Sequence, residues 1–461
     1  MTSTMNLTAL LVIGAGFLPA VTMAAPPREG GRLVAPLSDE DAWKRLPPAA
    51  KGAGQPLPVW ARMLAGEVPR TTAAFLQLDL AQRTRSPLDP KLRAAMRWVA
   101  AHADHCGYAE AYALADARRA GLDEARIEAL GREGHPGWSD ADRSALEFAR
   151  KMTVASDSVT DAEFAALVKH FGENRAASMV LLMAYANFQD RVLLCLGASV
   201  EPGGPLPPVD VAFDPASFTT RTTPPPPPVK SPLPKPSGRD LVADDPRWAD
   251  ASYEVLQGLL EAQRRKPTRL RVPPWDEVAR NLPPGLIERP SDIVWYRIVF
   301  GYAPELAVPF EILMRTAGAE GGPKWDRIFA SGLFWVTTKA MKCSYCMGHC
   351  EMTWEVAGLT RDEIAERSRL LAGDDWSSFP AAEQHAYAFA RKLTATPWAI
   401  SDDELDVLKR DFGPDRALLV VLNASRYHYM TRISNGFQLT LERENVFYDY
   451  FNTRPNAGDK R

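Results

Sequence analysis

Long apolar runs and helix-type spacing dominate the pattern of hydrophobic and polar positions along this chain. The run from Arg175 to Leu194 is almost wholly apolar and is long for a strand, so it predicts a buried helix. The run from Arg416 to Ile433 predicts another. Segments 145–155 and 386–395 are rich in helix-forming residues. We find no convincing strand-like alternation of any length, so the pattern predicts an all-α fold.

Capping residues mark helix starts in both halves of the chain. Ser158 or Thr160 in the first half and Ser401 in the second stand before Asp-x-Glu, which suits a first helical turn. Val159 and Ile400 supply the hydrophobic residue that often precedes such a cap. We therefore expect one helix to begin near residue 161 and another near residue 402.

A proline-rich stretch divides the chain. Prolines dominate from Pro202 to Pro236, including the run 224–228. Because proline lacks a backbone N–H and fixes its own φ, such a stretch favours an extended, semi-rigid linker. We place this linker at 201–240, between one helical domain at 45–200 and a second at 241–450.

The two halves repeat each other. Phe148-Ala149-Arg150-Lys151 returns 241 residues later as Phe389-Ala390-Arg391-Lys392. The same offset relates Asp161, Glu163, Phe171, Gly172, Arg175, Ala176 and Arg191 to Asp402, Glu404, Phe412, Gly413, Arg416, Ala417 and Arg432. Upstream, an offset of 235 relates Trp60, Arg62, Gly66 and Pro69 to Trp295, Arg297, Gly301 and Pro304. A repeat of this length predicts a duplicated domain, with small changes of offset at loops. We expect Arg191 and Arg432 to be structural or inter-subunit salt-bridge residues.

Length and composition limit the functional classes. A chain of 461 residues suggests two to three domains, and 46% hydrophobic with 24% charged residues is typical of a soluble globular protein. A net charge of -3 gives no reason to expect nucleic acid or an anionic membrane surface as a partner. Five cysteines is an odd number, so at least one thiol stays free or bonds outside the chain.

The first 25 residues predict an export signal. Leu7 to Val21 is largely apolar, and small residues precede Pro26 at a plausible cleavage point. The segment lacks Lys and Arg before Arg28, so an uncleaved membrane anchor is the alternative. Two glycines, a proline and the short apolar core argue against a stable span, which needs about 20 apolar residues. We therefore expect an exported protein, periplasmic or extracellular.

The stretch Cys343-Ser344-Tyr345-Cys346-Met347-Gly348-His349-Cys350 carries the strongest chemical signal. Three of the five cysteines lie in it. On a helix, residues three, four and seven apart share a face, so the three cysteines would form one stripe with His349 at its edge. Two thiols one turn apart can close a disulfide or hold a metal, and an imidazole or a helix N-terminus favours the thiolate. Small buried side chains without chemistry are the remaining interpretation.

The first half carries a reduced version of this motif. Gly121-Leu122 follows Cys106 by the same interval that separates Gly358-Leu359 from Cys343. In that alignment Cys106 and Tyr108 match Cys343 and Tyr345, while Ala109, Tyr112 and Ala113 replace Cys346, His349 and Cys350. The fold therefore does not need the last three residues, which indicates that they serve chemistry in the second half. We expect the two matching tyrosines to pack rather than react.

A tandem all-α unit with C-x-Y-C, a nearby His and a following Ala-Gly-Leu resembles the carboxymuconolactone decarboxylase family, in particular its AhpD-like alkylhydroperoxidase branch. The resemblance covers about 57–200 and 290–440 and implies two AhpD-like helical domains in tandem. It also implies a thiol mechanism without a bound cofactor, in which Cys346 attacks a peroxide, Cys343 resolves the product into a disulfide, and His349 acidifies the thiol. A dithiol reductant would restore the pair.

The resemblance also leaves positions to be filled. In the family's active peroxidases the histidine usually stands four residues after the second cysteine, where this chain has Cys350. The family's upstream glutamate would fall at Ser331, which cannot relay a proton, so Asp326 or Glu311 is expected to substitute. His428, which stands where the first half has Asn187, is a further accessory candidate, with a satisfied core histidine as the alternative.

Three functions stay open from the sequence. The first is a thiol peroxidase or thiol–disulfide oxidoreductase that acts on a hydroperoxide or disulfide substrate. The second is a zinc site formed by Cys343, Cys346, His349 and Cys350, the soft ligands that zinc accepts. The third is a non-catalytic, decarboxylase or lactone-acting domain. A monomer and a homo-oligomer, such as a trimer of tandems, both fit the duplicated unit.

Overall fold

A computed structural model of the chain describes residues 32–218, 247–321 and 326–453. Helices make up most of these ranges and the described residues form only two short strands, which confirms the all-α prediction. A short ribbon forms where no strand is expected, because β1 (Ala49–Lys51) pairs antiparallel with β2 (Ala212–Phe213). The export signal predicted at 1–25 and the proline run 224–228 lie outside the described residues.

Helices of the second half follow one another in the order of the first half. The first half contains α1 (Asp39–Arg45), α2 (Val59–Leu64), α3 (Pro69–Thr84), α4 (Pro90–Ala103), α5 (Gly107–Arg119), α6 (Glu124–Ala129), α7 (Asp140–Val154), α8 (Asp161–Phe171) and α9 (Glu173–Leu196). The second contains α10 (Tyr253–Gln263), α11 (Trp275–Ala279), α12 (Val294–Tyr302), α13 (Pro304–Gly321), α14 (Arg327–Ala340), α15 (Ser344–Val356), α16 (Arg361–Ala372), α17 (Ala381–Ala395), α18 (Asp402–Phe412), α19 (Pro414–Phe437) and α20 (Phe447–Tyr450). We call α2–α9 the first repeat and α12–α19 the second repeat, since these helices carry the matching sequence positions.

The capping signals place two helix starts where they were expected. Thr160 and Ser401 each cap a helix, and the side chain of the glutamate three residues later bonds back to the backbone of the cap. Ser158 lies one turn earlier, in a short 3₁₀ helix. At the far end of each of these helices a glycine adopts a positive φ, +80° at Gly172 and +77° at Gly413, and leads directly into the next helix.

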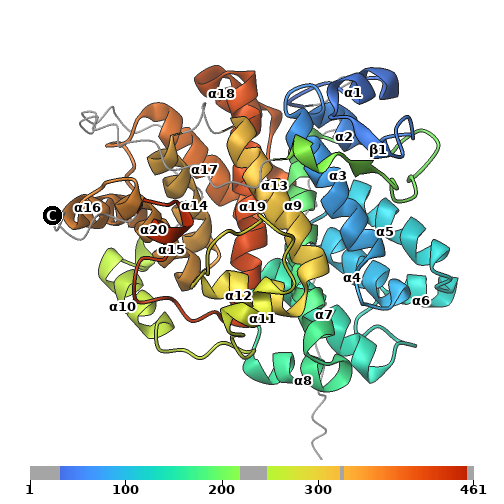
Figure 1. Cartoon of the computed structure of the whole chain (residues 1–461), viewed down its shortest axis with the longest axis horizontal. Coiled ribbons are helices and arrows are strands. Elements are labelled where there is room, and N and C mark those ends of the chain that lie inside the picture. The colour runs from blue at the N-terminus through green and yellow to red at the C-terminus, as the bar shows by residue number, and fades with distance from the viewer. Residues whose placement is uncertain (1–31, 219–246, 322–325, 454–461) are drawn as a thin grey trace, which may run out of the picture.

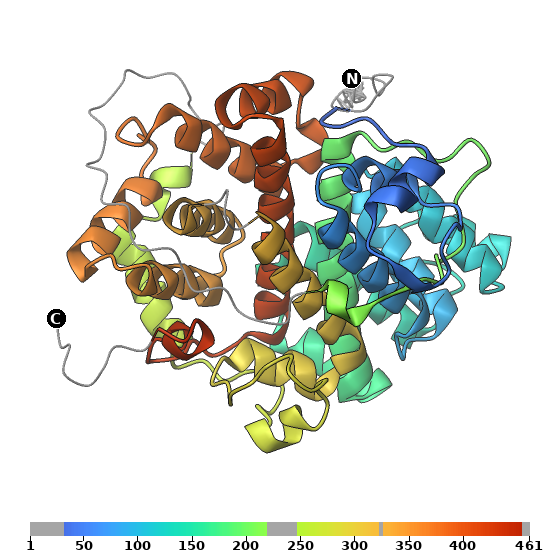
Figure 2. The same ribbon diagram turned by 45° about the horizontal axis from the view of Figure 1, so that its top comes forward.

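The two apolar runs form the central helices. α9 and α19 lie side by side through the middle of the molecule, with the first repeat on one side and the second on the other (Figures 1 and 2). The backbones approach closely where Gly436 meets Val180, since an added Cβ would lie 2.8 Å from the valine side chain. α9 is long and apolar enough to span a membrane by length and composition, but 94% of its most apolar 18-residue stretch is buried inside the protein. It is therefore a core helix of this fold.

Reciprocal arginine contacts join the repeats at their ends. Arg32 donates to Asp402 at 2.6 Å and to the carbonyl of Ile400 at 2.5 Å. Arg269 donates to Asp161 at 2.8 Å and to the carbonyl of Val159 at 2.5 Å. Each arginine thus reaches the N-terminus of the opposite repeat's equivalent helix, α18 or α8. Such reciprocity is what two similar units related by an approximate two-fold axis would produce.

The beginning of the proline-rich range, up to residue 218, packs on the first repeat. Val209, Val211 and Phe213 are buried, and β2 pairs with β1. The packing has a simple cause: between the prolines, apolar side chains at alternate positions share one face of an extended chain and can bury together. The described part of this range, up to residue 218, therefore extends the first helical unit.

Candidate functional site

A tight turn between α14 and α15 places the cysteine motif at a helix start. Lys342 adopts a positive φ of 51°, and the N–H of Cys343 donates to the carbonyl of Thr338 at 2.9 Å. Cys343 is then the N-cap of α15, at the end where the helix dipole favours a negative charge. The first repeat forms the same turn, with His105 at φ 52° and Cys106 as the N-cap of α5.

The three cysteines of the motif are reduced and enclosed. Cys343, Cys346 and Cys350 are 1%, 2% and 1% exposed, and none forms a disulfide. Burial, and next the hydrogen bond with the neighbouring Cys343 thiol, raise the pKa of Cys346 well above its ordinary value. Burial, then the charge of Glu351, raise the pKa of Cys350 in the same direction. The Cys346 thiol is therefore protonated at neutral pH.

A serine from the central helix contacts the second cysteine. The Cys346 thiol donates to Ser434 Oγ on α19 at 3.2 Å, and the Ser434 hydroxyl donates to the carbonyl of Met430 at 2.9 Å. At the offset of 241 the first repeat has Leu193 in place of Ser434, just as it has Ala109 in place of Cys346. The thiol and its hydroxyl partner are therefore both specific to the second repeat.

A buried carboxylate holds His349. The Nε2 atom of His349 lies 2.7 Å from Glu442 Oε2, while Tyr345 Oη and the backbone N–H of Val294 donate to Glu442 Oε1 at 2.9 and 2.6 Å. Burial raises the pKa of Glu442, but the charge and hydrogen bond of His349 and the Val294 N–H outweigh it, so the net pKa is lowered. Phe447 packs edge-on against the imidazole at 4.9 Å. Histidine, glutamate and tyrosine thus form a relay with one fixed geometry.

The first repeat contains the same relay without the histidine. Glu201 accepts from Tyr108 Oη at 3.0 Å, from Tyr112 Oη at 2.7 Å and from the N–H of Val59 at 2.8 Å. Glu201 and Glu442 are 241 residues apart, the offset that already relates the ends of the two repeats. The sequence predicted an acid upstream of Cys343 and not Glu442, although the offset of 241 from Glu201 points to it.

The two acids expected to replace the family's glutamate, Asp326 and Glu311, have other partners. Asp326 caps α14 by accepting from the backbone N–H groups of Ile328 and Phe329 at 2.7 and 3.3 Å. Glu311 is buried in a pair with Arg315 at 2.5 Å. Among the described residues neither contacts a cysteine of the motif, and the partner of His349 is Glu442. Asp326 faces the backbone because its position before α14 makes it the N-cap.

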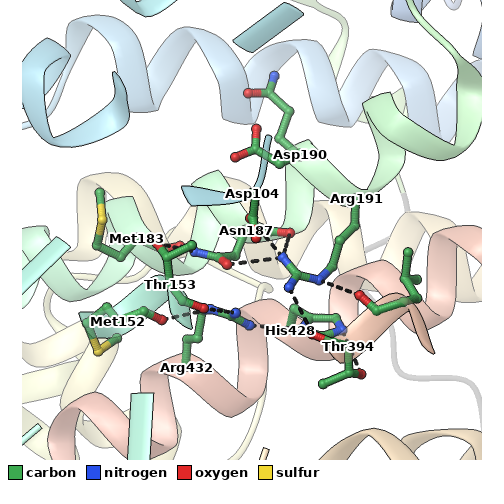
Figure 3. Close-up of polar contacts among 12 residues, drawn as sticks. Asp104, Met152, Thr153, Met183, Asn187, Asp190, Arg191, Thr394, His428 and Arg432 are labelled. Atoms are coloured by element: carbon green, nitrogen blue, oxygen red, sulfur yellow. Dashed lines mark hydrogen bonds and ion pairs between the residues drawn. The ribbon is translucent and has the colours of Figure 1, made fainter. Parts of the chain in front are cut away.

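His428 lies in the interior between the repeats, away from the cysteines. Its Nδ1 accepts from Arg432 at 2.8 Å and its Nε2 meets Thr394 Oγ1 at 3.2 Å. Figure 3 shows this group beside its counterpart, in which Asn187 accepts from Arg191 at 3.0 Å and donates to Thr153 at 3.2 Å. The core-histidine interpretation of His428 fits these contacts.

The two arginines of this interior cluster cross between the repeats. Arg191 donates to the carbonyls of Leu393 and Thr394, and Arg432 donates to those of Met152 and Thr153. Arg191 also pairs with Asp104 at 3.0 Å. Both arginines are structural residues that lock the repeats together, in keeping with the role expected from the sequence.

α10 covers the motif from outside, and no helix among the described residues of the first half covers α5 in the same way. It packs on α15, where Gln257 donates to Glu351 at 2.8 Å. Gly348 allows this approach, because a Cβ there would lie 2.6 Å from Leu441 and 3.3 Å from Leu260 of α10. A cavity of about 370 Å³ opens on the other side of the relay, with Glu442, Arg315, Arg443 and Tyr450 among its lining residues. It brings open volume next to Glu442.

The zinc site considered from the sequence is not assembled. Across the described ranges, no group of three or more His, Cys, Asp and Glu side chains is arranged to hold a metal ion. His349 is held away from the cysteines by its other contacts: its ring centroid lies 4.2 Å from that of Tyr345, and its Nε2 is hydrogen-bonded to Glu442. The motif therefore presents a thiol pair beside a histidine relay, and the four side chains do not converge on one point.

Fold and site together define an all-helical protein that carries a dithiol next to a histidine–glutamate relay. Residues 67–151 match the model of the Carboxymuconolactone decarboxylase family, so this part of the first repeat is similar to that family. The matched segment runs from the start of α3 into α7 and includes Cys106 and Tyr112 but not the C-x-x-C motif. No curated protein matches the chain.

Proposed function

We propose that this protein is a thiol-dependent oxidoreductase that reduces hydroperoxides with Cys343 and Cys346 as its redox pair. The observation that carries the proposal is the pair of hydrogen-bonded thiols in the first turn of α15, next to the His349–Glu442 relay. The family match supports it at the level of the domain, because thiol peroxidases form one branch of the family that the sequence resembles. The first repeat lacks the second thiol and the histidine, so we assign the activity to the second repeat alone.

The proposed reaction uses two electrons in each half. The Cys346 thiolate attacks the terminal oxygen of a hydroperoxide, an S–O bond forms as the O–O bond breaks, and the leaving alkoxide takes a proton to become an alcohol. Cys343 then attacks the sulfenic sulfur, forming the disulfide and releasing water. A dithiol reductant returns two electrons and two protons to the pair. The adjacent positions of the two cysteines on α15 allow the disulfide with modest adjustment of the helix start.

The relay supplies a fixed proton carrier near this chemistry. Glu442 accepts from the Nε2 side of His349, so Nδ1 is left as the ring nitrogen that can exchange a proton. Tyr345 and the Val294 N–H hold the carboxylate in place from its other oxygen. We propose that His349 delivers the proton to the leaving alkoxide and that Glu442 positions the imidazole for this step.

The raised pKa of Cys346 predicts how peroxide turnover depends on pH. Only the thiolate attacks a peroxide, and below its pKa the thiolate fraction rises about tenfold per pH unit. Because burial and Cys343 hold that pKa well above its ordinary value, kcat/KM for hydroperoxide should still be rising above pH 8. A profile that reaches its plateau below pH 7 would contradict Cys346 as the attacking thiol.

Single cysteine replacements test the proposal. Cys346→Ser should abolish peroxide consumption in the presence of dithiothreitol, and Cys343→Ser should accumulate a sulfenic acid on Cys346 that dimedone traps. Cys106→Ser is the matched control, since Cys106 is an equally buried N-cap without a second thiol, and its activity should equal wild type. If Cys346→Ser consumes peroxide as fast as wild type, the peroxidase function is excluded.

The proposal extends to the compartment and the reductant. We propose that the segment 1–25 directs export, so the disulfide formed at Cys343–Cys346 must be reduced by a dithiol partner in an oxidising compartment. Sequencing the N-terminus of protein recovered from the expressing cell should find a start near Pro26. Recovery of chain that still begins at residue 1 in the cytoplasmic fraction would argue against export.

A further inference from the structure

The first repeat contains a small polar pocket that the thiol chemistry does not use. It has a volume of about 40 Å³ and lies between α3, α4, α5 and α9. Its wall includes Gln82, Arg83, Arg93, Arg97, Tyr112 and Gln189. Gln82 is deeply buried, while Arg93 and Tyr112 are partly exposed and mark the side that opens to solvent.

Most polar groups of the wall already have partners. Arg83 binds both oxygens of Asp116 at 2.8 Å. Asp79 accepts from Tyr185 at 2.6 Å and from Gln189 at 3.2 Å. Arg97 pairs with Asp190 and donates to Gln189 at 3.0 Å. These closed pairs hold the wall rigid and leave little capacity for binding a ligand.

Two groups of the wall have no hydrogen-bonding partner among the residues that the structure describes. Gln82 is 1% exposed, and neither its Nε2 nor its Oε1 makes a hydrogen bond in the described structure. Leaving a buried amide without hydrogen-bond partners is costly, so such groups are rare unless something else satisfies them. Within the described ranges, no hydrogen bond or ion pair joins the guanidinium of Arg93 to another residue, although it lines the same pocket. An open amide and an open cation therefore share one wall.

The second repeat shows that the fold does not require these residues. At the offset of 235 between α3 and α13, Gln82 corresponds to Ala317. At the offset of 237 between α4 and α14, Arg93 corresponds to Ala330 and Arg97 to Phe334. The second repeat thus has apolar residues in place of these three polar side chains. The polar pocket is a property of the first repeat's sequence rather than of the shared helical scaffold.

We propose that this pocket binds a small hydroxycarboxylate, with Arg93 pairing with the carboxylate and Gln82 bonding to both functional groups. The amide Nε2 donates to a carboxylate oxygen and Oε1 accepts from the hydroxyl, which gives both free atoms of Gln82 a partner. The volume limits the ligand, because about 40 Å³ of cavity holds roughly three water molecules. Glycolate is the smallest member of the class and suits this space.

Isothermal titration of the full chain with three matched probes tests the proposal. Glycolate should bind with one site per chain. Acetate lacks the hydroxyl and should bind about fivefold more weakly, and glycolamide lacks the charge and should bind at least about tenfold more weakly. Equal affinity for all three, or no binding of glycolate at millimolar concentration, would overturn the proposal.

Variants locate the binding. Arg93→Gln should lose glycolate binding by at least about tenfold, and Gln82→Met should lose the preference for glycolate over acetate. Arg85→Gln, an exposed arginine at the end of α3, is the matched control and should bind as wild type. Wild-type affinity in Arg93→Gln would place any bound glycolate elsewhere and refute the site. The ligand series on wild type remains decisive if Gln82→Met does not fold.

Discussion

Replacing His428 with asparagine should remove a pH dependence of stability that the second repeat has and the first repeat lacks. Burial, together with the charges of Arg191 and Arg432, lowers the pKa of His428 well below its ordinary value. The imidazole is therefore neutral when folded, with Nδ1 accepting from Arg432. In the first repeat Asn187 makes the equivalent pair of hydrogen bonds and cannot titrate.

The magnitude follows from proton linkage. An unfolded histidine titrates near pH 6.5, so below that pH the unfolded chain binds one proton more than the folded chain. The stability that His428 contributes is fully present above its unfolded pKa and is lost as pH falls toward the depressed folded pKa. At about 1.36 kcal/mol per pH unit, the loss between pH 7 and pH 5 is about 2 kcal/mol. Asp104 and Asp190 lie nearby but are paired with Arg191 and Arg97.

Urea unfolding at pH 5, 6, 7 and 8 measures this contribution. The free energy of unfolding of wild type minus that of His428→Asn should fall by about 2 kcal/mol from pH 7 to pH 5. Every other titrating group is common to both proteins and cancels in the difference, as does any constant loss of packing. A difference that stays flat across this range would show that His428 titrates alike in the folded and unfolded chain, and the reasoning from its burial would be refuted.

Three further substitutions have defined outcomes. His349→Tyr introduces the residue that the first repeat has at this position, so the free energy of unfolding in urea should change by no more than about 1 kcal/mol. Peroxide turnover should fall by about 100-fold, which is a typical contribution of a proton-transfer group. Met341→Asp places a carboxylate where the first repeat has Asp104, and so gives a counter-ion to the buried Arg432, which has no carboxylate partner in the described structure. The free energy of unfolding at pH 7 should rise by about 1–3 kcal/mol. A variant less stable than wild type would argue that Arg432 is not an unpaired charge. Gly348→Ala should lower the free energy of unfolding by about 1–3 kcal/mol and should also lower peroxide turnover, because the new Cβ displaces the segment that carries Glu442. A urea midpoint equal to that of wild type would contradict the close approach of Leu441 to Gly348.

Much of the fold could be predicted from sequence because helix signals are local or repeated. The apolar runs became α9 and α19, and Thr160 and Ser401 cap the helices they were expected to cap. These features depend on residues within one or two turns, or on burial of a whole helix face. The packing of residues 201–218 on the first repeat and the cover that α10 places over α15 depend on contacts between distant segments, and the local pattern does not report these.

The site could be predicted only as far as the motif itself extends. The spacing of Cys343, Cys346 and His349 placed them at the start of one helix. The groups that complete the site, Ser434 and Glu442, come from α19 and from the segment that follows it. Apolar periodicity says which face of a helix is buried, not which polar side chain from another segment meets it there. The offset that relates Arg191 to Arg432 also relates Glu201 to Glu442 ten residues further along the chain.

The relay separates what the scaffold needs from what the chemistry needs. Both repeats keep the glutamate, the first tyrosine and the N–H of a valine that opens α2 or α12, so this part ties the end of each repeat to its beginning. What differs is the fourth position, tyrosine in one repeat and histidine in the other. A hydroxyl satisfies the carboxylate as well as an imidazole does, but only the imidazole exchanges protons near neutral pH. The scaffold therefore does not require the histidine, which stands in the repeat that also has the second and third thiols of the motif.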